Sequence, residues 1–183
     1  GGSWVDGAYT TEQSGTWTVE ADYNGIIPSS YSTSLTVNKV DYNILLNGDF
    51  ELGDLSYWGY SGNYGGVVHA PNPVHSGLHS AMIYGAILYS YFAAPSHDKV
   101  YNFTYYSIKG AIQPSIDAVI FYTDTTNTTV TYSDAEVSWT FHDLTPYIDP
   151  AKIMNGFFLV SIGTNAYSYF DDIELWVSTD DVP

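Results

Sequence analysis

The chain has 183 residues, with 20 acidic side chains against four basic ones, so its formal net charge at pH 7 is -16. A surface of this charge repels phosphate backbones, which excludes nucleic acid as a partner and disfavours anionic membranes. The sequence contains no Cys, which excludes disulfides and thiolate chemistry. No apolar run approaches the roughly 20 residues that a membrane span requires.

The composition favours a β-rich fold. Hydrophobic residues make up 45% of the chain and charged residues only 13%, and there are 18 Tyr. Tyr, Thr and Val fit pleated, half-buried surfaces, and no long segment carries apolar residues at helical spacing. We therefore expect an all-β protein.

Residues 1–40 are expected to form a separate strand annex. Apolar residues from Trp17 to Tyr23 alternate with polar ones, which indicates a half-buried strand, and a second short strand is expected over 34–37. The phrase SGTWTVEADYNG…SLTV resembles the last strands of bacterial immunoglobulin-like domains. So few strands cannot bury a face by themselves. The annex therefore packs on the following domain, ends a preceding one, or adds strands to a neighbouring molecule.

Residues 41–183 are expected to form the main domain, which opens on the stretch NILLNGDFELGDLSYW. An apolar strand is predicted over Ile44–Leu46, and the Asn-Gly pair after it turns the chain. In the extended segment that follows, Asp49 and Glu51 point to the same side.

The rest of this domain shows regularly spaced short strands. A Gly- and Tyr-rich loop is predicted over Gly59–Gly66. Gly, Pro, Asn or Asp separates the strands that follow, which are predicted over residues 67–70, 88–92, 100–108, 116–122, 137–141, 157–162 and 169–175. This spacing predicts an antiparallel β-sandwich of the jelly-roll kind.

Three phrases resemble one known family. The opening stretch quoted above, HSGLHSAMIYG (75–85) and YFDDIEL (169–175) are similar to segments of the carbohydrate-binding-module jelly rolls with a galactose-binding-like fold. The resemblance covers residues 43–177. It implies that the first and last strands lie close together, which would bring Asp171 towards Glu51.

A calcium site is the first candidate for chemistry. In a chain this acidic, divalent cations are natural partners, because Ca²⁺ prefers carboxylate and carbonyl oxygens. The family resemblance implies that the ligands are Asp49, Glu51 and Asp171, with Asp172 as a substitute. Backbone carbonyls near His75–Ser80 would complete the shell.

Aromatic residues are the second candidate. Flat rings with a few polar groups bind sugars, and the rings that could line such a cleft are Trp58, Tyr60, Tyr64, Tyr84, Tyr89 and Trp139. The alternative is that these rings fill the core, because a sandwich also consumes aromatic residues.

Catalysis has little support in the sequence. The five His residues are accompanied by no nucleophile elbow, zinc helix or phosphate-binding glycine loop, so we expect a protein that is not an enzyme. Two glycosylation sequons, at Asn102 and Asn127, are compatible with a secreted, extracellular protein. A start at Gly1 without Met also suggests a processed, secreted chain.

Two functions remain. In the first, calcium and the N-terminal strands join copies of the chain into an extracellular filament, tube or surface layer. In the second, the domain is a carbohydrate-binding module that recognises a polysaccharide through an aromatic cleft. The acidity and the unpaired annex favour the first.

Overall fold

The structure is a computed structural model, in which fewer residues are described by their side chains than by their backbone. The backbone is described for residues 2–5, 8–11, 15–21, 31–37, 41–91, 99–110, 115–132, 137–162 and 167–178, and side chains for 42–90, 100, 102–110, 115–132, 137–162 and 167–177. The strands are β1 (Gly2–Val5), β2 (Ala8–Thr11), β3 (Gly15–Ala21), β4 (Tyr31–Val37), β5 (Asp41–Asn43), β6 (Gly59–His69), β7 (His79–Tyr91), β8 (Lys99–Lys109), β9 (Ser115–Tyr122), β10 (Asn127–Tyr132), β11 (Thr140–Asp143), β12 (Met154–Ile162) and β13 (Tyr167–Ser178).

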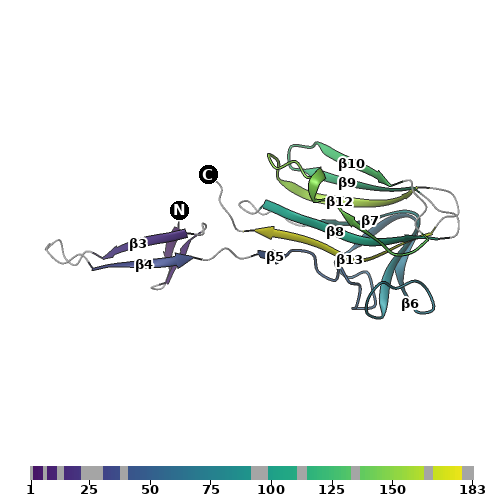
Figure 1. Ribbon diagram of the computed structural model, residues 1–183, viewed down its shortest axis with the longest axis horizontal. Helices are drawn as coiled ribbons and strands as arrows, with labels where there is room; N and C mark the ends of the chain where they lie inside the picture. Colours follow the sequence, from purple (N-terminus) through teal and green to yellow (C-terminus); the bar gives the residue numbers. More distant parts are fainter. Residues whose placement is uncertain are drawn as a thin grey trace.

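The all-β prediction is confirmed. One 3₁₀ turn, Thr145–Tyr147, is the helical element of the described residues, and none of them forms a helix able to cross a membrane. Strands β5 to β13 form one antiparallel sheet with the main path β10-β9-β12-β7-β13-β8-β11, while β5 lies beside β13 and β6 beside β7 (Figure 1).

The N-terminal strands form two hairpins. β1 pairs with β2, and β3 pairs with β4. Among the described strands, no pairing joins these hairpins to the nine-stranded sheet. The side chains of the predicted annex lie outside the described residues, so the proposed alternation from Trp17 to Tyr23 stays a prediction.

Strand β7 connects two layers of the sheet. Its residues 81–84 pair with β13, whereas residues 87–91 pair with β12. Between these halves lies Gly85 with φ 49°, and Gly62 on the neighbouring β6 has φ 131°. Only glycine adopts such angles readily, so both strands can bend here. The sheet therefore curls into a sandwich.

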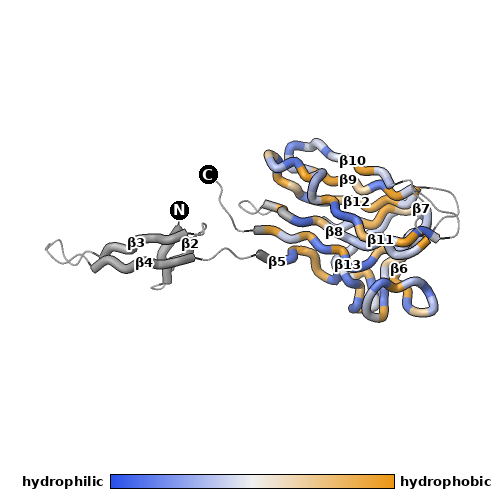
Figure 2. The backbone as a smooth tube through the Cα atoms, in the orientation of Figure 1, coloured by the Kyte–Doolittle hydropathy of each residue, from blue (hydrophilic) through white to orange (hydrophobic). Residues whose placement is uncertain are grey.

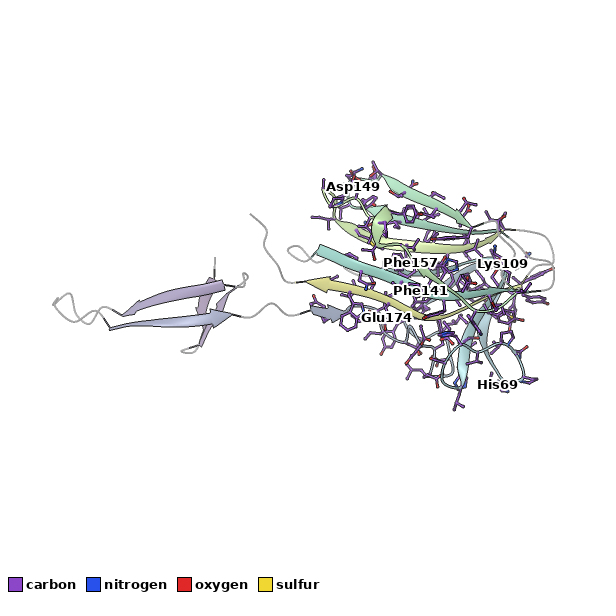
Figure 3. The ribbon with its side chains drawn as sticks, viewed as in Figure 1. His69, Lys109, Phe141, Asp149, Phe157 and Glu174 are labelled. Atoms are coloured by element: carbon purple, nitrogen blue, oxygen red, sulfur yellow. The ribbon has the colours of Figure 1, made fainter. Side chains whose placement is uncertain are left out.

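Aromatic and aliphatic side chains fill the space between the layers. The ring centroids of Phe103 on β8 and Phe157 on β12 lie 4.6 Å apart, although these strands do not pair. Strand β9 alternates buried and half-buried residues along its whole length. Figure 2 shows apolar segments along this strand. Phe157 is labelled among the side chains of Figure 3. The jelly-roll prediction is confirmed.

Four details differ from the sequence predictions. The strand predicted over 137–141 is β11, which begins three residues later, at Thr140. The first strand of the domain is Asp41–Asn43, although Ile44 still donates to the carbonyl of Leu175 at 3.0 Å. The predicted loop Gly59–Gly66 is wrong, because these residues begin β6 and pair with β7. Strand β10 was not expected, since its sequence NTTVTY is mostly polar.

Candidate functional site

The two ends of the domain meet, as the resemblance implied. β5 pairs with β13, and the amide of Ile173 donates to the carbonyl of Gly48 at 2.9 Å. As a result, Glu51 and Asp171 both bind the loop of residues 75–79.

Asp171 holds the start of this loop. It is fully buried, and its Oδ2 accepts hydrogen bonds from the amides of His75 at 2.9 Å and Ser76 at 3.2 Å. Burial raises the pKa of the Asp171 carboxyl to about 6, although these amides favour its ionised form.

Glu51 holds the other end. Its Oε1 accepts from the amides of Leu78 and His79, each at 2.8 Å. The hydrogen bond from Leu78 is the main cause that keeps the pKa of Glu51 below its usual value. A Cβ at Gly77 would overlap the Glu51 carboxylate, and Gly77 also has φ 63°, so this position requires glycine.

Of the other two predicted calcium ligands, Asp172 contacts the side chains of the same loop, whereas Asp49 has a partner elsewhere. Asp172 contacts His75 Nδ1 at 2.6 Å and accepts from the Ser76 hydroxyl at 2.8 Å. Asp49 accepts from the amide of Glu51 at 3.3 Å. Asp49 and Asp172 also line a polar hollow of about 180 Å³ beside Gly48.

Three of the four predicted ligands, Glu51, Asp171 and Asp172, therefore contact the loop of residues 75–79. Among the described residues, no group of three or more His, Cys, Asp or Glu side chains is placed to hold a metal ion. The donor chemistry fits calcium, because the site offers carboxylate oxygens. Calcium stays a prediction, with Glu51 and Asp171 as the two acids that accept hydrogen bonds from backbone amides of this loop.

A second site lies on the outer face of the layer formed by β9, β12 and the end of β7. The Phe158 ring contacts Tyr89 at 5.7 Å on one side and Phe121 at 4.5 Å on the other. Beside these rings is a hollow of about 290 Å³, lined by Phe121, Tyr122, Thr123, Thr125, Asn155 and Phe158. We call it the aromatic hollow. Its lining contains no charged side chain.

The backbone shapes both rims of this face. On the β6 side, Gly59 lies directly opposite Tyr89, and a Cβ at Gly59 would stand 2.5 Å from the tyrosine ring. The missing side chain lets the Tyr89 ring lie over the strand. On the other side, Thr125 has φ 68°, a conformation that costs a β-branched residue energy and often marks a functional turn.

Lys152 stabilises the turn that contains Thr125. Its Nζ donates to the Thr126 hydroxyl at 2.6 Å and lies 3.2 Å from the Asp124 carboxylate. Hydrogen bonds from Thr126 keep the pKa of Asp124 below its usual value. The turn that carries Thr125 at the rim of the hollow is therefore held by a network through its neighbours Asp124 and Thr126.

The predicted sugar-binding rings are distributed over the molecule. Trp58 lies in the core: it is 9% exposed, it packs on Phe50 at 5.3 Å, and its Nε1 donates to the carbonyl of Leu46 at 3.0 Å. The prediction that Trp58 lines a cleft is therefore wrong. Tyr60 is exposed and lies against Gly65.

The remaining predicted rings lie on other parts of the surface. Tyr89 borders the aromatic hollow, whereas Tyr64 and Tyr84 are paired on the opposite layer. Trp139 contacts the edge of the His75 ring at 5.5 Å. The prediction missed Phe121, Phe158 and Asn155. Alternate residues of a strand face opposite sides, so the predicted strands 116–122 and 157–162 could have indicated the two outward-facing Phe residues. Nothing in the sequence marks Asn155.

Two further features concern accessibility. Asn127 is exposed at the start of β10, whereas Oδ1 of Asn102 is buried without a hydrogen-bond partner among the described residues. Of the two predicted glycosylation sites, Asn127 is thus the more accessible one. The Ser107 hydroxyl lies 2.9 Å from His142 Nε2, but both residues are buried, so this pair does not offer a nucleophile to a substrate.

Comparison with known proteins gives the fold. No protein-family model and no curated protein matches the sequence. A family 61 carbohydrate-binding module, solved in complex with β-1,4-galactotriose, is similar with a TM-score of 0.56 and 18% identity, over 73% of this chain and 97% of that one. A family 16 module has a TM-score of 0.54 and 19% identity, over 73% and 99%.

A third solved structure agrees. The C-terminal family 22 module of Clostridium thermocellum Xyn10B has a TM-score of 0.52 and 14% identity, and the match covers 78% of this chain and 94% of that module. The protein therefore has the fold of the carbohydrate-binding-module jelly rolls, which confirms the resemblance drawn from its sequence.

Proposed function

We propose that this protein is a non-catalytic carbohydrate-binding module whose aromatic hollow binds a neutral polysaccharide chain. The observation that carries this proposal is the combination of Phe121 and Phe158 as apolar walls with Asn155 and two threonines as polar groups. Such mixed linings orient a ligand through hydrogen bonds while the walls take up its apolar faces. The uncharged lining suits a neutral sugar.

The fold supports the same proposal. Three solved structures with this fold are carbohydrate-binding modules, and one of them holds a galactose oligosaccharide. Because these likenesses are below 25% identity, they indicate the fold and leave the choice of sugar to experiment.

Affinity electrophoresis tests the proposal. The full chain is run through native gels containing β-1,4-galactan or xylan, beside a Tyr89→Ala/Phe158→Ala variant and a Phe141→Ala control, whose ring lies on β11 away from the hollow. We expect retardation of the wild type and of the control, and a loss of tenfold or more in affinity for the double variant, or roughly 1.4 kcal/mol. Equal retardation of all three proteins would refute the hollow as the site.

We also propose a structural calcium ion at the loop of residues 75–79. Glu51 and Asp171 would hold it, and the ion would supply a positive charge that links the two ends of the domain. Both carboxylates already bind this loop. An extracellular location, where calcium and polysaccharides are available, is part of this proposal.

Assembly is a second candidate. The observation that favours it is that hairpins β1–β2 and β3–β4 pair only with themselves among the described strands, and isolated hairpins are marginally stable in water. In this proposal the N-terminal strands and calcium join copies of the chain. Electron microscopy with calcium and then with a chelator tests it, and monodisperse particles under both conditions would exclude it.

A further inference from the structure

A row of tyrosines crosses the layer opposite the aromatic hollow. Tyr64 on β6 lies directly across from Tyr84 on β7, and Tyr84 lies directly across from Tyr167 on β13. Directly opposed residues of antiparallel strands place their side chains on the same face. We call these three residues the tyrosine row.

The row faces outward. Tyr64 is 47% exposed and Tyr167 is 43% exposed, while the neighbours Ile83 and Ser168 point inward and are fully buried. The rings of Tyr84 and Tyr167 contact each other at 4.9 Å with an interplanar angle of 34°. The row therefore presents a contacting pair of rings, Tyr84 and Tyr167, with a third exposed ring, Tyr64, on the adjacent strand.

Glycine keeps the strip flat at its edge. A Cβ at Gly66 would stand 2.9 Å from the Tyr64 hydroxyl, so the Tyr64 ring lies along its own strand over the bare backbone. This resembles the way in which the Tyr89 ring lies over Gly59 at the aromatic hollow. In both places a tyrosine presents ring surface where glycine leaves room.

The described positions next to the row on its face are uncharged. The adjacent positions on the same face are Gly66, Met82, Tyr169 and Ile108, which lie opposite one another in register. Burial raises the pKa of Tyr169, so it too stays neutral near pH 7. The strip thus combines apolar ring surface with phenol hydroxyls.

The charge of the protein indicates which class of ligand can bind the tyrosine row. Two copies of this chain, each with a formal net charge of -16, repel one another at this face, because these positions offer no carboxylate for a bridging cation, and a cationic protein would find no acidic partner among them. A neutral polysaccharide suffers neither penalty, and aromatic rings with hydroxyl groups bind sugar faces.

We propose that the tyrosine row is a second binding surface for a neutral polysaccharide, so that one molecule links two chains. This inference rests on the proposed function only for the second link, because the row can bind a polysaccharide without the hollow. Since the two surfaces lie on opposite layers, a bivalent protein would join soluble polysaccharide chains into networks.

Affinity electrophoresis and light scattering with β-1,4-galactan and xylan test this. Four forms of the full chain are compared: wild type, Tyr84→Ala/Tyr167→Ala, Tyr89→Ala/Phe158→Ala, and the quadruple variant. We expect each double variant to keep measurable retardation and the quadruple variant to lose it. Scattering by wild type should peak at an intermediate ratio of protein to polysaccharide, and fall by tenfold or more in either double variant.

A milder variant controls for folding. Tyr84→Phe/Tyr167→Phe keeps the rings and should keep scattering, whereas Tyr64→Ala, at the exposed edge, should lower it. Unchanged scattering in the row variants overturns the inference and leaves the hollow standing. If Tyr89→Ala/Phe158→Ala is still retarded but Tyr84→Ala/Tyr167→Ala is not, the row is a binding surface and the hollow is not. No retardation of the wild type overturns both.

Sedimentation without sugar covers the remaining occupant. A concentration-dependent dimer that Tyr84→Ala/Tyr167→Ala abolishes would overturn the inference in favour of a second copy of the chain. A monomer at all concentrations agrees with a polysaccharide as the occupant.

Discussion

The two outer faces of the domain carry aromatic rings in different settings. On one face, Phe158 stands between Tyr89 and Phe121 beside a hollow with polar groups at its rim. On the other face, the tyrosine row runs across the three strands β6, β7 and β13. The number of rings is therefore a poor guide to binding. Their register and the glycines beside them decide whether they form a walled site or a flat strip.

The largest expected effect concerns a ring that belongs to neither face. Trp58→Ala should lower the free energy of unfolding by about 3–5 kcal/mol, because it removes a core ring and leaves a cavity. Trp58→Phe should cost less, since it mainly loses the hydrogen bonds from Nε1 to the carbonyls of Leu46 and Asn47. Urea unfolding measures both.

Sugar binding provides the control for Trp58. Trp58→Phe should keep its affinity for β-1,4-galactan or xylan if the ring is structural. If Trp58→Phe instead keeps full stability but no longer binds, the Trp58 ring takes part in sugar binding.

A pH titration of stability tests a buried carboxyl on β13, one of the strands that carry the tyrosine row. Because the pKa of Asp171 on β13 is raised to about 6, the folded protein holds a proton that the unfolded chain releases above its ordinary pKa of 3.8. Stability in EDTA should therefore fall as the pH rises from about 4 to about 6, by roughly 2 to 3 kcal/mol. Asp171→Asn should flatten this slope.

Glu51 gives the opposite slope. Its pKa is lowered, so the stability it contributes is present above 4.5 and is lost as the pH falls through the folded-state pKa. Glu51→Gln should remove this loss of stability at acid pH.

If Asp171→Asn leaves the profile between pH 4 and 6 unchanged, burial does not control the titration of the Asp171 carboxyl.

Calcium should stabilise the same loop. At a hundredfold excess over its dissociation constant, it would add about 2.7 kcal/mol to the free energy of unfolding. Calorimetry should show a higher Tm with calcium than with EDTA, and Asp171→Asn combined with Glu51→Gln should abolish the difference. A shift of the same size in that double variant would place the ion elsewhere.

The smallest expected effect separates the two faces most cleanly. Gly59→Ala places a Cβ 2.5 Å from the Tyr89 ring, and Gly66→Ala places one 2.9 Å from the Tyr64 hydroxyl. The first should weaken binding at the hollow by about three- to tenfold, or up to 1.4 kcal/mol, with little loss of stability, because the ring end can move. The second should change only the row.

Affinity electrophoresis of each glycine variant, with its partner as the control, distinguishes these outcomes. Equal weakening by both substitutions would mean that the two faces do not act separately.

The sequence predicted the framework better than the binding surfaces. The regular spacing of short strands and the turn residues between them were sufficient for the sandwich, and the phrases at both ends of the domain implied that Asp171 lies towards Glu51. Trp58 was misplaced because a large ring after a turn suits a core as well as a cleft. The glycines of β6 were assigned to a loop, although they pair with β7. Register across strands, which composition does not contain, creates the tyrosine row.

Strand β7 carries Tyr84 and Tyr89, so one continuous strand passes from the row to the hollow. If both faces hold polysaccharide, a pull between the two bound chains runs along this strand. Its backbone hydrogen bonds to β6, β13 and β12 would then be loaded together in shear instead of opening one by one. In that case the domain would resist such a pull through several strand pairs at once.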